Sequence, residues 1–127
     1  QPLLQRVDFN GLTLEPVIAP GVGSGPMPEL VRGLTIATDG DVAWFTGNFF
    51  SDETLWQINL RDGSRELILN ATRLRGGAAI QARGFPRYLA ARDMILLPAV
   101  ERSFFTRFLY YIDPVTVARV QLPMRYQ

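Results

Sequence analysis

Two stretches of this chain resemble each other at a fixed separation, and this internal similarity constrains the fold more than any other feature. Residues 39–69 carry an apolar run after an Asp, a second apolar run, and a third run beyond a turn; residues 93–122 carry the same succession. Self-similarity at such a period is typical of repeat architectures, in which each copy is one supersecondary unit. Three pairs of residues mark the similarity, each pair 54 residues apart: Asp39 and Asp93, Ile58 and Ile112, Arg65 and Arg119.

The repeated runs have the composition of short β-strands. They are aromatic and β-branched, and they are bounded by Asp, Gly, Asn and Ser. Asp62-Gly63, Asp113-Pro114 and Asp39-Gly40 favour tight turns, because Gly tolerates a positive φ and Pro presets a negative one. We therefore predict antiparallel strands at 33–37, 41–47, 55–60 and 65–70 in the first unit, and at 87–91, 94–100, 108–113 and 118–122 in the second.

The amino-terminal segment, residues 1–19, resembles the last two strands of a unit. Residues 6–18 repeat the pattern of residues 57–68, with Gly11 and Gly63 in the turns. No helix is predicted. Residues 20–26, which are rich in Gly and Pro, and residues 70–86 are expected to be the long connections.

A family resemblance rests on residues 28–44 (PELVRGLTIATDGDVAW) and 109–116 (LYYIDPVT). Both are similar to the strand-and-turn pattern of β-propeller blades of the NHL, YVTN and gluconolactonase-like type. The expected fold class is all-β: a β-propeller-like fragment of about two and a half four-stranded antiparallel blades, at 54 residues a blade. The half blade would be 1–19 and the blades 28–70 and 82–123, within one domain, 1–127. A β-sandwich or a partly open barrel is the alternative.

Such a fragment cannot close a propeller, which needs about four to eight blades. Bare sheet faces and edges invite association. The remaining blades are therefore expected from another chain or from identical copies. Because the sequence begins at Gln1, we expect a processed or excised product, secreted or periplasmic.

The composition excludes several kinds of chemistry. The chain has no Cys, no His and no Lys, so thiolate, His-based and Schiff-base catalysis are excluded within it. The sequence thus favours a binding protein over an enzyme. A net charge of +1 gives no reason to expect nucleic acid, and no apolar run approaches the roughly 20 residues of a membrane span.

Two short loops combine aromatic pairs with charges and form the predicted binding site. In a propeller the loops between the second and third strands lie on one face, so these side chains would form a partner-binding surface with aromatic anchors. Alternatively, Phe50 and Phe105 plug the gaps between blades, which is the interpretation we favour for either ring alone. The predicted binding residues are Phe49, Phe50, Asp52, Glu53, Arg102, Phe104, Phe105 and Arg107.

Other candidate sites have simpler explanations. Trp44, Trp56, Tyr110 and Tyr111 could stack on a sugar, but at strand positions they favour packing. Asp39, Asp41, Asp52, Glu53 and Asp93 could ligate Ca²⁺, but Asp39 and Asp93 lie where a turn favours Asp. We therefore predict no cofactor and no metal site, with Ca²⁺ as the one possibility. Arg73, Arg75 and Arg83 form a basic loop, and Asn70-Ala71-Thr72 is a glycosylation sequon.

The predicted function is a binding or assembly module that forms part of a larger β-propeller and presents a loop-rich face to a protein partner. Two alternatives come from other classes. The chain could be part of a propeller hydrolase or lactonase whose metal site is shared between chains, or it could be a sugar-binding oligomeric propeller.

Overall fold

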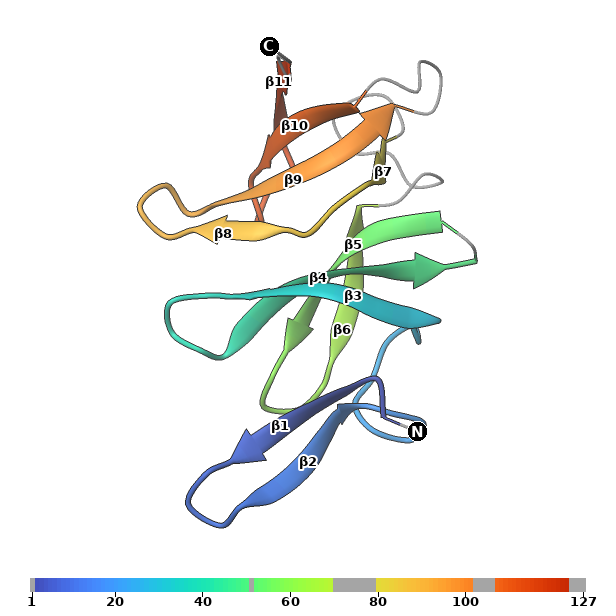
Figure 1. Cartoon of the computed structure of the whole chain (residues 1–127), viewed down its shortest axis with the longest axis vertical. Coiled ribbons are helices and arrows are strands. Elements are labelled where there is room, and N and C mark those ends of the chain that lie inside the picture. The colour runs from blue at the N-terminus through green and yellow to red at the C-terminus, as the bar shows by residue number, and fades with distance from the viewer. Residues whose placement is uncertain (1, 51, 70–79, 102–106, 124–127) are drawn as a thin grey trace.

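The structure, a computed structural model, describes residues 2–50, 52–69, 80–101 and 107–123. Within these ranges every regular element is a β-strand and all strand pairs are antiparallel, so the predicted all-β class is confirmed (Figure 1). None of the sheets closes on itself. The same residues contain no helix that is long and apolar enough to cross a membrane.

The strands form three sheets that follow one another along the chain. The first is a hairpin of β1 and β2, the second has the order β3-β4-β5-β6, and the third has the order β11-β10-β9-β7 with β8 also paired to β9. The bounds are β1 Leu4–Asp8, β2 Thr13–Ile18, β3 Leu30–Ile36, β4 Val42–Phe49, β5 Asp52–Asn59, β6 Arg65–Leu69, β7 Ile80–Ala82, β8 Arg87–Leu89, β9 Met94–Glu101, β10 Arg107–Ile112 and β11 Arg119–Pro123.

Strand β7 was not predicted, because residues 70–86 were assigned to a connection. Ile80–Ala82 is too short to show an alternating pattern, and Arg83–Pro86 separates it from β8. Both β7 and β8 pair with β9 along the same edge. Together they occupy the place that β3 fills without interruption in the second sheet.

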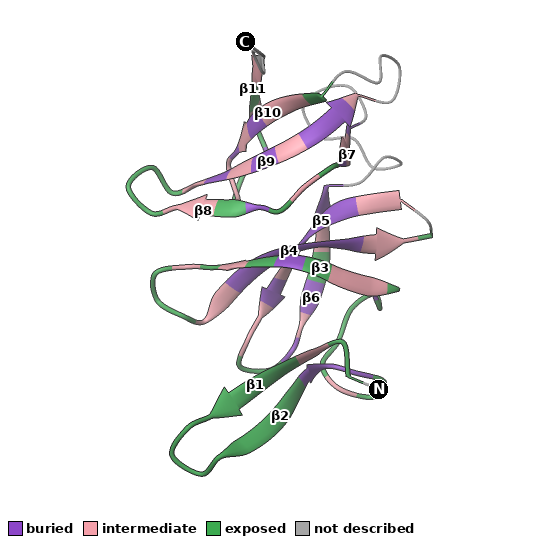
Figure 2. Ribbon diagram, viewed as in Figure 1, coloured by how far each residue is buried: buried purple, intermediate pink, exposed green. Residues whose placement is uncertain are grey.

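The three sheets are stacked face to face along the long axis of the molecule, with the second sheet in the middle (Figure 1). On one of its faces Phe45, Trp56 and Ile58 pack with Val17 and Ile18 of the first hairpin. On the other face Trp44, Leu55 and Ile68 pack with the third sheet, whose contribution includes Ile95, Leu97, Tyr110 and Ile112. The middle sheet is therefore covered on both sides, and Figure 2 shows the buried residues concentrated in it and in the sheet above.

The turns that close the three C-terminal hairpins share one geometry. Asp8, Asn59 and Asp113 each accept, through the side-chain Oδ1, a bond from the backbone N–H two residues later, at 3.0, 2.8 and 2.8 Å. Four residues after each of them, Leu12, Gly63 and Val117 have φ values of 52°, 75° and 63°. The predicted turns at Asp62-Gly63 and Asp113-Pro114 are thus confirmed, and the segment at 8–13 has the same form.

The strand registers correct the constant separation of 54 residues. Hairpin β10–β11 corresponds to β5–β6 at 54, since Ile112 pairs with Arg119 as Ile58 pairs with Arg65. Hairpin β8–β9 corresponds to β3–β4 at 52, however, since Leu89 and Met94 pair as Ala37 and Val42 do. Asp93 therefore occupies the position of Asp41, not of Asp39. The missing two residues are restored in the longer connection between β9 and β10.

Candidate functional site

The predicted loop surface begins at the two-residue connection between β4 and β5. Phe49 packs edge-on against Phe50 and Trp56, with ring centroids 4.4 and 5.7 Å apart. Phe50 is in the left-handed region (φ 49°) and its side chain is 81% exposed. Phe50 therefore does not plug a gap between the described sheets, which corrects the favoured interpretation for this ring. Trp56, Phe49 and Phe50 instead form a graded row from core to solvent.

A charged pair lies beside this aromatic row. Nε of Arg32, on β3, is 2.8 Å from Oε1 of Glu53, on β5. The Glu53 side chain is largely buried while that of Arg32 is half exposed, so the guanidinium is the part that a partner could reach. Arg32 was missed by sequence reasoning, because nothing in the chain near Glu53 indicates which residue of β3 lies opposite it.

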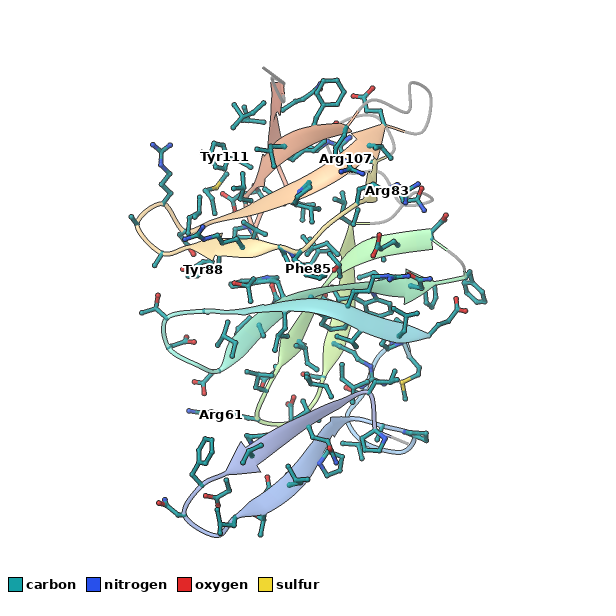
Figure 3. All side chains as sticks on the ribbon, viewed as in Figure 1. Arg61, Arg83, Phe85, Tyr88, Arg107 and Tyr111 are labelled. Carbon is teal, nitrogen blue, oxygen red and sulfur yellow. The ribbon has the colours of Figure 1, made fainter. Side chains whose placement is uncertain are left out.

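The remaining predicted site residues come from the third sheet. Arg107 begins β10 and is exposed, on the same side of the stack as the ends of β4 and β5 (Figures 1 and 3). The structure also adds Phe85, 69% exposed, whose ring lies against Gly33. Arg102, Phe104 and Phe105 lie outside the described residues, as do the sequon and Arg73 and Arg75.

A groove of about 760 Å³ lies between the second and third sheets, near the turns at the other end of the strands. Its aromatic wall is a stacked pair, Trp44 and Tyr88, with centroids 5.0 Å apart and planes at 24°. Trp44 Nε1 donates to Gln57 Oε1 at 3.0 Å. The groove is lined by Ala37, Thr38, Asp39, Val42, Trp44, Gln57, Glu66, Tyr88, Asp93, Pro114 and Val115.

Acidic groups surround the Tyr88 hydroxyl in this groove. The hydroxyl donates to Asp93 Oδ1 at 2.7 Å. That hydrogen bond, with burial and the charges of Asp93 and Asp39, raises the pKa of Tyr88. Asp39 Oδ1 also accepts from the backbone N–H of Asp41, at 3.0 Å, as expected for a turn Asp. Sequence reasoning missed the groove, because its walls come from strands about fifty residues apart.

The packing interpretation of the other aromatic residues is confirmed for Trp44, Trp56 and Tyr110, which are at most 4% exposed. No three His, Cys, Asp or Glu side chains within the described ranges are grouped so that they could share one metal ion.

The outer face of the third sheet is apolar and uncovered. Its residues pair across β9, β10 and β11 in two rows, Leu96 with Tyr111 and Val120, and Pro98 with Leu109 and Leu122. None of the six is buried, and Val120 is 58% exposed. The guanidinium of Arg92 lies 5.8 Å above the Tyr111 ring, at one end of this face.

Comparison with known proteins gives no relative: no family model, no curated protein and no solved structure matches the chain. The arguments about function therefore rest on the geometry of this chain.

Proposed function

We propose that this chain is a binding and assembly module, which forms part of a larger β-propeller and presents its loop-rich end to a protein partner. The observation that carries the proposal is the uncovered apolar face of the third sheet. Six apolar residues in two cross-strand rows form a surface of a kind that water-exposed sheets avoid.

A recurrent packing relation supports the identity of the missing neighbour. Leu4 and Val17 of the first hairpin pack on the second sheet, and Leu55 and Ile68, at the corresponding positions one unit later, pack on the third sheet. The next positions in this series are Leu109 and Leu122, on the uncovered face. A further blade, supplied by another chain or by an identical copy, would bury them in the same way.

The loop end supports the second part of the proposal. Phe50 is an exposed aromatic anchor held by Phe49, and Arg32 lies next to it with its guanidinium partly in solvent. Aromatic residues and Arg dominate the binding energy of protein interfaces. Arg107 extends the surface onto the third sheet.

The test is the association state of the 127-residue chain, measured by sedimentation velocity over a range of concentrations, together with binding of a hydrophobic dye. We expect self-association or strong dye binding, and we expect Leu109→Glu to reduce either one. Val115→Glu, at an exposed turn position that is not on this face, is the control. A compact monomer that binds no dye would contradict the proposal.

Replacement of Phe50 by Ser tests the loop end separately. Because the ring is exposed, the variant should keep its thermal unfolding temperature while losing affinity for a captured protein partner. An unfolded variant would instead mean that Phe50 belongs to the core.

A further inference from the structure

The groove between the second and third sheets has a counterpart between the first hairpin and the second sheet, and that counterpart contains an arginine. Arg6 on β1 pairs in register with Glu15 on β2. Its guanidinium forms an ion pair with Glu15 and also donates to the backbone oxygen of Leu60, in the second sheet, at 3.0 Å. A cation from the chain itself thus bridges the two sheets.

The second groove has the same framework without the cation. Gln57 occupies the position of Arg6 and pairs in register with Glu66, the counterpart of Glu15. The Gln57 side chain is held by the indole of Trp44. Pro114, which lines the groove, corresponds to Leu60. Among the described residues no Arg lines this groove, and Glu66 forms no ion pair with any of them.

We propose that this groove binds an organic cation that carries a guanidinium group, with Glu66 as its carboxylate partner. The bound group would take the place that Arg6 fills in the first groove, between Glu66 and the backbone at Pro114. The Trp44–Tyr88 pair and Val42 provide an apolar wall for the carbon chain that carries the cation. Asp39 and Asp93 add negative charge at the same end of the groove. This inference stands independently of the proposed assembly.

The geometry favours this ligand over a metal ion or a sugar. The acidic side chains are not close enough for three of them to ligate one metal ion, whereas an extended cation can interact with carboxylates that lie farther apart. A sugar would need a free aromatic face. Trp44 is 4% exposed and is already stacked on Tyr88, so its indole offers none. The volume of about 760 Å³ is that of a small-molecule site.

The experiment is a calorimetric titration of the intact chain with argininamide at low salt, with citrulline amide, which has the same shape but no charge, as the second probe. We expect saturable binding of argininamide that weakens with added salt, and no binding of citrulline amide. A capped tripeptide with a central Arg distinguishes the sources of the cation: tighter binding of the tripeptide indicates a peptide segment, and equal or weaker binding indicates a small molecule.

Two variants and one matched control decide whether the groove is the site. Glu66→Gln should weaken binding about fivefold or more. Glu15→Gln removes the equivalent carboxylate from the groove that Arg6 already fills, and it should leave binding unchanged. Gln57→Arg should abolish binding, because it places a guanidinium beside Glu66 as Arg6 is placed beside Glu15.

Three results would overturn the proposal: no saturable binding of argininamide at millimolar concentration, equal losses in Glu66→Gln and Glu15→Gln, or binding of a neutral methyl glycoside in place of argininamide. Circular dichroism of each variant shows whether a loss of binding reflects a loss of fold.

Discussion

At the scale of single residues, Arg65 holds more of the structure together than any residue of the predicted site. Its side chain is buried, and its guanidinium donates to the backbone oxygens of Pro26 at 2.6 Å, Gly63 at 3.0 Å and Val22 at 3.2 Å. Burial lowers the pKa of Arg65 from its usual value. One side chain thus fixes the Gly- and Pro-rich connection of residues 20–26 to the second sheet.

We expect Arg65→Met to lower the free energy of unfolding by about 2–4 kcal/mol, because it leaves buried carbonyl oxygens without donors. Arg61→Met is the matched control. It breaks an exposed pair with Asp41, whose Oδ1 is 2.8 Å from Nε, and should cost less than about 1 kcal/mol. Urea denaturation measures both. Equal effects of the two substitutions would mean that the Arg65 contacts do not hold the connection.

At the scale of elements, the shared hairpin turn predicts a response to acid. The hydrogen bonds that the Asp113 carboxylate accepts, first from the N–H of Val115 and then from that of Thr116, lower its pKa from 3.8. The unfolded chain therefore binds a proton more readily than the folded one. The stabilisation is complete above the unfolded pKa and is lost as the pH falls through the lower, folded value.

Asp113→Asn should therefore keep the stability near neutral pH and flatten its decrease in acid, because Asn59 already fills the corresponding position in the second sheet. The reciprocal change, Asn59→Asp, should make the acid decrease steeper. Thermal unfolding between neutral pH and the acid range tests the pair. The idea fails if both variants follow the parent curve.

The same elements show what the sequence could predict. Strand and turn positions were predictable, because alternating apolar residues and Asp-Gly or Asp-Pro pairs act over a few neighbours. Strand β7 was not, because three residues carry no period. The two-residue difference between the hairpins was hidden by an Asp in both turns, Asp39 and Asp93, although the registers place Asp93 opposite Asp41's position.

The sites follow the same division. The exposure of Phe50 depends on a positive φ in a two-residue connection, and the pairing of Arg32 with Glu53 depends on the register between β3 and β5 through β4. The groove needs Trp44 and Tyr88 to meet across two sheets. Contacts of this kind between distant strands leave no local pattern in the chain.

At the scale of the whole molecule, the stack predicts an order of local stability. The second sheet is covered on both faces, whereas most of β1 and β2 is exposed and the hairpin is held mainly by Leu4, Val17 and Ile18. Segments with few buried contacts open with less free energy than the core. We therefore expect amides of β1 and β2 to exchange with solvent well before those of β4 and β5.

Native-state hydrogen exchange with and without Ile18→Ala measures this order. Removing a buried side chain costs about 2–5 kcal/mol, and here the loss should appear in β1 and β2 while β9 and β10 keep their protection, since the third sheet packs on the opposite face of the second. Trp56→Ala, within the second sheet, should instead reduce protection in all three. Uniform loss in Ile18→Ala would show that the three sheets unfold as one cooperative unit, and the sheet-by-sheet stacking on which the assembly proposal rests would then not describe how this chain is stabilised.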